Sequence, residues 1–296
     1  MNGPMDQART LRLLRAEQDN DNTESTTGGD HLVITVASGK GGVGKTNLVA
    51  NLAVLLGQQG YRVLATDGDL GLANLDLAFG LTPKQTLMDV LRGDVDIGQV
   101  IQTASDNVAL LPGCSGGYEL ANLSEIDRRE LFHVIDELEA GFDALLIDAA
   151  AGIGSNAVGF AAAAQQVVLV TTPEPTAFAD CYAFAKVLAA RSGHTRVGLV
   201  VNMVNNPTEG DQVYERFSLL ANRFLNLAVD HLGSITRDSN IPQSIRNGTP
   251  AVVAAPKAPS SQCVRGILKR LMGAPRDDNP GGIALFWQKL LGGGRA

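Results

Sequence analysis

The sequence predicts an α/β protein with a doubly wound, mostly parallel sheet and helices on both of its faces. Hydrophobic residues make up 45% of the 296 residues, aromatic residues only 5%, and 33 residues are glycine. Short aliphatic runs without polar alternation recur along the chain, and segments with helical spacing separate them. Such runs are typical of parallel strands that are buried on both faces.

Seven aliphatic runs are candidate strands: residues 32–37, 62–66, 108–111, 144–147, 167–170, 198–201 and 232–235. Helical spacing is found at residues 46–60, 124–138, 176–190 and 211–229. We divide the chain into three parts. Residues 1–30 hold a short helix and a polar linker, residues 31–273 form the main domain, and residues 274–296 hold a linker and an amphipathic helix.

Composition excludes several classes of function. Acidic residues (31) outnumber basic residues (24), so the formal charge is -7 and a generally basic nucleic-acid-binding surface is not expected. The three cysteines are far apart and form no CxxC, which argues for a reducing compartment and against a zinc or iron–sulfur site. The most apolar stretch, 157–170, is too short to span a bilayer. We expect a cytosolic protein.

A glycine-rich loop follows the first strand and opens a helix. It matches GxxxxGK[ST], the P-loop that binds nucleoside triphosphates. Its glycines let backbone N–H groups and the helix N-terminus point at phosphate oxygens. Lys45 is expected to reach the β- and γ-phosphates and Thr46 to bind Mg²⁺, so we expect ATP and Mg²⁺ as cofactors. The predicted nucleotide-binding residues are Gly39, Lys40, Gly41, Gly42, Val43, Gly44, Lys45, Thr46 and Asn47.

Acidic residues at strand ends complete the predicted site. Asp148 ends the run 144–147, where a carboxylate can hold Mg²⁺. Asp67 and Asp69 follow the run 62–66, and Asp69 is our candidate for orienting the attacking water. The alternative for each is an aspartate that caps the next helix.

Lys40, within KGGVGKT, resembles the signature lysine of deviant Walker A ATPases, the group of MinD, ParA, Mrp and nitrogenase iron proteins. The resemblance implies that the chain dimerises around ATP and hydrolyses it slowly. It also implies that Lys40 reaches the partner's phosphates, the role of an arginine finger. The predicted catalytic residues are therefore Lys40, Lys45 and Asp69.

Within this group, almost the whole chain resembles the MinD-like flagellar-number regulators FlhG/FleN. The resemblance is carried by residues 45–93 and by the segments LLPGCSGGYELANL, LLIDAAAGIG and TTPEPTAFADCYAFAKVL. Asn202 matches the family asparagine that hydrogen-bonds adenine. Two positions depart from the family pattern, since Thr236 stands where proline is usual and Ala149 where threonine is usual.

The N-terminal segment resembles the DQAxxLR activator motif of FlhG. The matching residues are Asp6, Gln7, Ala8, Leu11 and Arg12. The resemblance implies docking on an FlhF-like GTPase, with Gln7 helping to position its hydrolytic water. Flagellar switch (C-ring) proteins or a flagellar transcription regulator are further partners that it implies. The alternative is an ordinary frayed tail.

The last helical segment, 282–291, has an apolar face. That face consists of Ile283, Phe286, Trp287, Leu290 and Leu291. It resembles the membrane-targeting helix of MinD-like proteins and predicts peripheral binding to the inner face of the cell membrane in the ATP state. The alternative is a helix docked on the protein's own body or at a dimer interface.

The leading hypothesis is an ATP-dependent switch that regulates the number or placement of flagella. A ParA-like partitioning ATPase would need a basic surface for DNA, against which the acidic balance argues. A metal-cluster carrier would need paired cysteines. MinD-like division-site placement is the nearest alternative, and the N-terminal motif argues against it.

Overall fold

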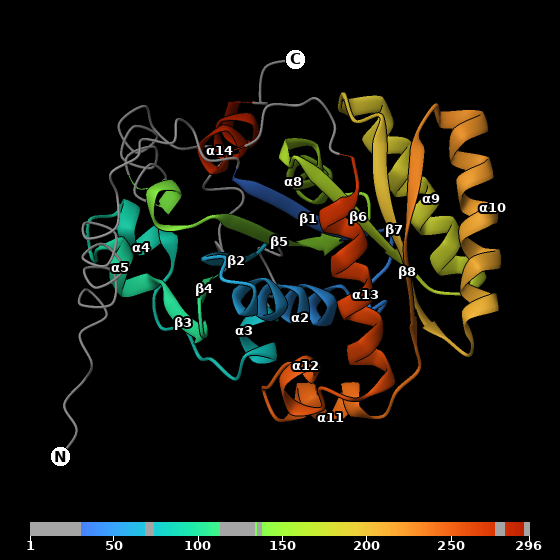
Figure 1. Cartoon of the computed structure of the whole chain (residues 1–296). Helices are drawn as coiled ribbons and strands as arrows, with labels where there is room; N and C mark the ends of the chain where they lie inside the picture. The colour runs from blue at the N-terminus through green and yellow to red at the C-terminus, as the bar shows by residue number, and fades with distance from the viewer. Residues whose placement is uncertain (1–30, 69–73, 113–133, 135–137, 276–281, 293–296) are drawn as a thin grey trace, which may run out of the picture.

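The structure is a computed structural model, and it describes residues 31–68, 74–112, 134, 138–275 and 282–292. Its centre is an eight-stranded sheet in the order β3-β4-β2-β5-β1-β6-β7-β8 (Figure 1). All neighbouring strands are parallel except β3 and β4. The strands are β1 (Leu32–Ser38), β2 (Val63–Asp67), β3 (Gln102–Ser105), β4 (Val108–Leu111), β5 (Ala144–Ala151), β6 (Gln166–Thr171), β7 (Arg196–Val204) and β8 (Ala228–Thr236).

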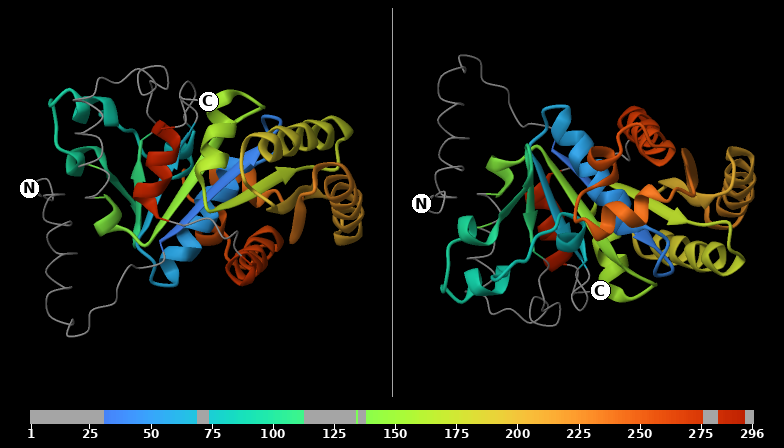
Figure 2. Two further views of the ribbon diagram at one scale, coloured as in Figure 1. Left: turned by 90° about the horizontal axis from the view of Figure 1, so that it is seen from above. Right: turned by 90° about the horizontal axis from the view of Figure 1, so that it is seen from below.

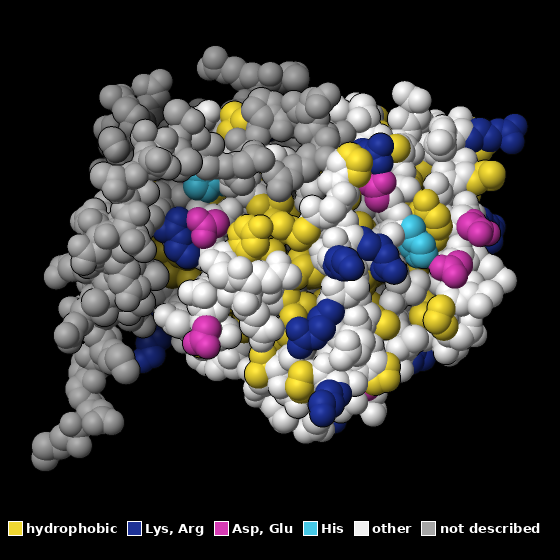
Figure 3. Space-filling view, viewed as in Figure 1, with side chains coloured by type: hydrophobic (Ala, Val, Ile, Leu, Met, Phe, Trp, Pro, Cys, Tyr) yellow, Lys and Arg dark blue, Asp and Glu magenta, His cyan; other side chains and the backbone are white. Residues whose placement is uncertain are grey.

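Helices cover both faces of the sheet, which confirms the predicted doubly wound α/β fold (Figures 1 and 2). One face carries α2 (Lys45–Gln58), α3 (Leu75–Ala78), α11 (Asn240–Arg246), α12 (Ala251–Ala254) and α13 (Pro259–Gly273). This layer faces the viewer in Figures 1 and 3. The opposite face carries α4 (Leu87–Leu91), α5 (Ile97–Val100), α8 (Ser155–Ala163), α9 (Pro175–Arg191), α10 (Pro207–Leu225) and α14 (Ile283–Gly292).

Burial on both faces explains why the central strands read as unbroken apolar runs. All seven residues of β1 are buried. Val33 and Ala37 pack into the core under α8 and α9, whereas Ile34 and Val36 pack into the core under α2 and α13. Alternate side chains of one strand therefore fill two separate cores, and polar alternation has no place in the pattern.

One predicted helix has different bounds in the structure, and one strand was not predicted. The helix predicted at 211–229 spans Pro207–Leu225 instead. Proline fits the first turn of a helix, the Asn206 side chain accepts from the Glu209 N–H, and Asn226 ends the helix in a left-handed conformation. The edge strand β3 was missed, because its sequence QTAS is polar and only one neighbour pairs with it. Most of the helix predicted at 124–138 lies outside the described residues.

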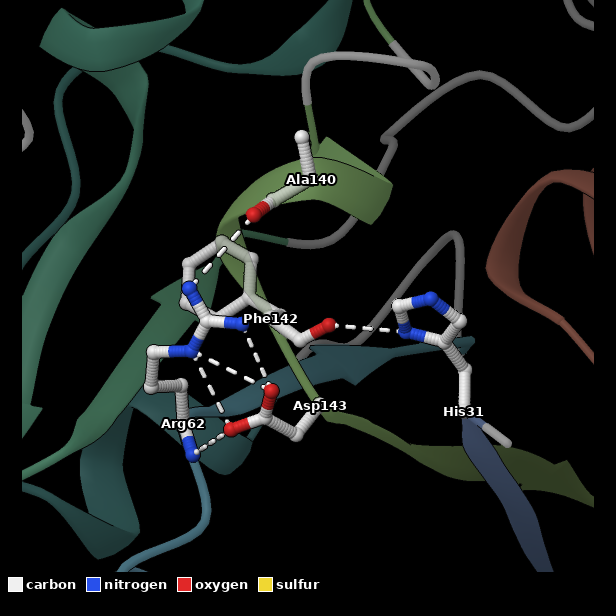
Figure 4. Close-up of polar contacts among 5 residues, drawn as sticks. All are labelled: His31, Arg62, Ala140, Phe142 and Asp143. Atoms are coloured by element: carbon white, nitrogen blue, oxygen red, sulfur yellow. Dashed lines mark hydrogen bonds and ion pairs between the residues drawn. The ribbon is translucent and has the colours of Figure 1, made fainter. Parts of the chain in front are cut away.

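Polar contacts tie together the strand starts at the edge where β1, β2 and β5 begin (Figure 4). The Arg62 guanidinium contacts both carboxylate oxygens of Asp143, with the shortest N···O distance at 2.6 Å, and the Arg62 N–H also binds this carboxylate. Burial raises the pKa of Asp143, but the hydrogen bonds and charge of Arg62 outweigh it, so the pKa lies below its ordinary value. His31 Nδ1 lies 3.0 Å from the carbonyl oxygen of Phe142.

The C-terminal helix α14 packs against α8 and β1. Ile283, Phe286 and Trp287 are each at most 1% exposed, and the ring of Phe286 lies 6.1 Å from that of Phe160. Leu290 packs partly buried against the same core. In this conformation Ile283, Phe286 and Trp287 of the face predicted to enter a membrane are covered by protein, the arrangement that the sequence left as the alternative. None of the described helices has the length and apolarity needed to cross a membrane.

Candidate nucleotide-binding site

The glycine-rich loop lies at the centre of the sheet, between the end of β1 and the start of α2. Gly42 and Gly44 have φ angles of 78° and 92°, in the left-handed region that favours glycine. Helix α2 has no side-chain cap and no acidic residue in its first turn. Its first N–H groups and its dipole therefore suit an anionic ligand such as a phosphate.

Close packing requires glycine at two loop positions. A Cβ on Gly39 would lie 1.9 Å from the backbone oxygen of Asp180 in α9. A Cβ on Gly44 would lie 2.3 Å from Nδ2 of Asn202, at the end of β7. The loop is thus wedged between α9 and β7, and this fixes its path over the sheet edge.

The two predicted magnesium ligands, Thr46 in α2 and Asp148 in β5, are in contact. The Thr46 hydroxyl donates a hydrogen bond to Oδ2 of Asp148, whose residue is 3% exposed. Asp148 reaches this position because β5 is parallel to β1, with Asp148 in register with Val36. A hydroxyl and a carboxylate are hard oxygen donors, so this pair fits Mg²⁺, which takes its remaining ligands from water and phosphate.

Lys45 lies at the first position of α2 and is 8% exposed. No ion pair within the described part of the chain involves it. A buried ammonium without a carboxylate partner favours binding of an anion, because the anion would offset the cost of removing the charge from water. The structure therefore gives Lys45 the position that a phosphate-binding lysine needs.

The structure describes Asp67 but not Asp69. The Asp67 carboxylate accepts hydrogen bonds from the N–H groups of Asn74, at 2.7 Å, and Leu75, at 3.1 Å. It therefore binds the start of α3, the capping alternative left open by the sequence. Asp69 lies outside the described residues, as do the N-terminal residues Asp6, Gln7, Ala8, Leu11 and Arg12.

Lys40 is held by groups of its own chain. Its ammonium lies 2.8 Å from Oε1 of Glu174 and 2.8 Å from Oγ1 of Thr176, at the start of α9. The hydrogen bond from Lys40 is the main cause that lowers the pKa of Glu174, and Thr176 and the Lys40 charge add to it. Both partners are exposed, so this pair is weak and can be exchanged for another anion.

Asn202 holds the glycine-rich loop against the end of β7. Its Nδ2 donates to the carbonyl oxygen of Val43 at 2.8 Å, and its Oδ1 accepts from the N–H of Met203 at 2.8 Å. Both groups of the amide thus bind the protein's own backbone, and the contact of Asn202 with adenine stays a prediction. Met203 itself has a φ of 60°, an uncommon value for a residue with a side chain.

An open hollow of about 870 Å³ lies beside the loop. Sequence reasoning gave no role to several residues that line it: Thr172, Pro173, Glu174, Met203, Asn205, Glu209 and Arg237. Glu174 could have been found, because it lies in the segment TTPEPTAFAD that follows a strand. The left-handed Met203 has no signal in the sequence.

The loop, the buried lysine and the Thr46–Asp148 pair on a parallel sheet define a P-loop nucleotide-binding protein. A family model, the CobQ/CobB/MinD/ParA nucleotide-binding domain, matches residues 34–251. The antiactivator FleN of Pseudomonas aeruginosa is 36% identical, with 88% of this chain and 92% of FleN covered. The flagellum site-determining protein YlxH of Helicobacter pylori is 33% identical, with 89% and 90% covered.

Two solved structures of MinD proteins resemble this chain in fold and sequence. MinD of Pyrococcus horikoshii in complex with Mg-ADP has a TM-score of 0.64 and 31% identity, covering 81% of this chain and 96% of that protein. MinD of Pyrococcus furiosus has a TM-score of 0.64 and 32% identity, with 82% and 98% covered. The chain belongs to the MinD/ParA family of P-loop ATPases, and within it to the MinD-like FlhG/FleN group.

The wedged glycine gives a first prediction. Gly44→Ala should abolish nucleotide binding, because its Cβ would displace Asn202 and distort the loop. Gly60→Ala is the matched control, since Gly60 has the same φ of 92° with no atom near the added Cβ. The control should lose only about 1 kcal/mol of stability and bind nucleotide normally. Titration with a fluorescent ADP analogue measures both, and equal affinities for the two variants would contradict the assigned role of the loop.

Proposed function

We propose that this chain is an ATP-dependent dimerising switch that regulates the number or placement of flagella. The names of FleN and YlxH, which align over almost the full length of both chains, support the flagellar role. The observation that carries the switch is the position of Lys40, bound to Glu174 at the rim of the nucleotide site.

The switch works by an exchange of partners. In the described conformation, Lys40 binds Glu174 and Thr176 of its own chain, and we assign this pairing to the monomer. With ATP, the γ-phosphate of a second protomer offers a more highly charged anion, and Lys40 leaves Glu174 to bind it. Since ATP and ADP differ in this contact, ATP favours the dimer. Asp69 then orients water for slow hydrolysis, which returns the chain to a monomer.

Glu174→Gln tests the exchange. It keeps the size of the side chain but removes the charge that holds Lys40, so more dimer should form at a given concentration of ATP and Mg²⁺. Lys40→Ala should abolish hydrolysis, because the trans contact is lost. Asp69→Ala should retain the ATP dimer without hydrolysis. Sedimentation velocity and phosphate release measure these outcomes.

Glu209→Gln is the control for that experiment. Glu209 lines the same hollow, but its carboxylate binds Asn205 and not Lys40. If both glutamine variants dimerise alike, the Lys40–Glu174 pair does not control assembly. A persistent monomer for Asp69→Ala in ATP would overturn the role assigned to Asp69.

The N-terminal motif is proposed to stimulate a partner GTPase of the FlhF type. A glutamine can donate to and accept from one water molecule, which is why Gln7 is assigned this role. A peptide spanning residues 5–18 should raise GTP turnover by the cognate GTPase, and Gln7→Ala should remove most of the effect. Arg9→Ala, at a variable position of the motif, is the control. Unchanged turnover with the wild-type peptide would remove this partner from the proposal.

We also propose that the ATP dimer visits the membrane through α14, and that α14 must first leave α8. Ile283, Phe286 and Trp287 are covered in the described conformation, so lipid binding and docking through these side chains exclude each other. One released helix would bind weakly, but two helices on one dimer gain avidity. In this way the nucleotide state sets the time spent at the membrane.

Gly159 allows this competition to be tested. A Cβ on Gly159 of α8 would lie 3.7 Å from Cδ1 of Leu290, an ordinary contact. Gly159→Ala should therefore be neutral, whereas the larger side chain of Gly159→Leu should displace α14 and raise binding to anionic liposomes in ADP. Trp287 is the only tryptophan in the chain, and its emission should shift to the red on release. If α14 stays docked while Gly159→Leu binds liposomes strongly, lipid contacts another surface of the protein.

A further inference from the structure

The C-terminal stretch of the main domain, residues 239–275, carries an unbalanced positive charge. Residues 239–275 contain no aspartate or glutamate, although the whole chain has a net charge of -7. The basic residues in this stretch are Arg246, Lys257, Arg265, Lys269 and Arg270. Nothing in the nucleotide site or in the docking of α14 requires this separation of charge.

The fold brings most of these cations together along α13. Figure 3 shows Lys and Arg side chains along this helix, on the face that carries α2. Lys269 and Arg270 are exposed and Arg265 is half-buried. Arg270 donates to the carbonyl oxygen of Leu232 at 2.8 Å. No cation of α13 takes part in an ion pair within the described part of the chain.

An open hollow of about 580 Å³ adjoins this basic stripe. It lies between the end of α2 and the middle of α13, and its lining combines apolar and polar side chains. The lining residues are Leu55, Gln58, Gln59, Arg265 and Leu268. Leu55 and Leu268 are at most 3% exposed, so they form a recessed apolar floor of small accessible area. Helix α2 contributes no acidic residue to the hollow.

We propose that this α2/α13 face binds an acidic, amphipathic helical segment of a partner protein. Arg265 and Lys269 are four residues apart, so they lie side by side on α13. Carboxylates four residues apart on a partner helix have the same spacing and can pair with both. Apolar side chains on the adjacent side of that helix would fill the hollow, the helix-in-groove mode of recognition.

The observations favour an acidic peptide over other polyanions. Duplex DNA carries one charge per about 1.7 Å, many more than this short stripe can neutralise, and its phosphates would leave the apolar floor unused. A membrane is disfavoured because α14 packs on the opposite face of the sheet.

A labelled helical peptide tests the proposal with the full-length protein. The probe is a designed helix of about four turns, with glutamates four residues apart and leucines on the adjacent side. Its affinity should fall at least about tenfold for Arg265→Glu/Lys269→Glu, because two attractions become repulsions. Gln58→Lys should tighten binding, since it adds a cation to the opposite wall. Fluorescence anisotropy measures both changes.

A matched variant separates this site from net charge. Lys186→Glu/Arg191→Glu makes the same charge change on α9, in the opposite layer, and should leave the affinity unchanged. Equal loss in the two double variants would overturn the proposal, as would absence of peptide binding at millimolar concentration. Tighter binding of a random 20-base-pair duplex, or of anionic vesicles, would assign the face to nucleic acid or lipid instead. The ATPase rate of each variant confirms that it folds, and the test does not depend on the proposed flagellar role.

Discussion

The site depends on one contact between helix α2 and strand β5, from the Thr46 hydroxyl to the Asp148 carboxylate, which are 102 residues apart in sequence. The contact exists because β5 is the parallel neighbour of β1, so both strands end at the same edge. The loop between β1 and α2 must then pass through a narrow space beside α9 and β7. Only glycine fits at Gly39 and Gly44, so the fold dictates the loop sequence as much as the nucleotide does.

The same edge explains which site residues could be predicted. A P-loop is a local pattern with a known chemical purpose, and a strand-end aspartate is visible from the apolar run before it. Thr46, Lys45 and Asp148 were therefore placed from the sequence. Contacts made by tertiary packing were not. The partner of Lys40, the left-handed Met203 and the brace from Asn202 depend on how α9 and β7 approach the loop.

The predictions from the sequence were correct for the fully buried strands and failed at the two edges of the sheet. The central strands show as apolar runs because both faces are covered. The start of β8 does not, because several of its residues are only half-buried, so 226–229 was read as helix. The polar edge strand β3 has the same difficulty. The hydrophobic periodicity of a sequence reflects which of its residues are buried. At the edge of a sheet the strands are only partly buried, so this periodicity no longer distinguishes a strand from a helix.

The apolar face of α14 shows a further limit, because lipid and protein select the same side chains. Each of Ile283, Phe286 and Trp287 gains roughly 1.5–3 kcal/mol when it leaves water, whichever apolar environment it enters. Most of this free energy is common to the docked and the lipid-bound states and cancels in the proposed exchange. The equilibrium is then set by small differences, such as how closely the partly buried Leu290 packs against the core. In the proposed ATP dimer, which presents two such helices, the modest free energy of one additional phosphate contact is then enough to move this equilibrium.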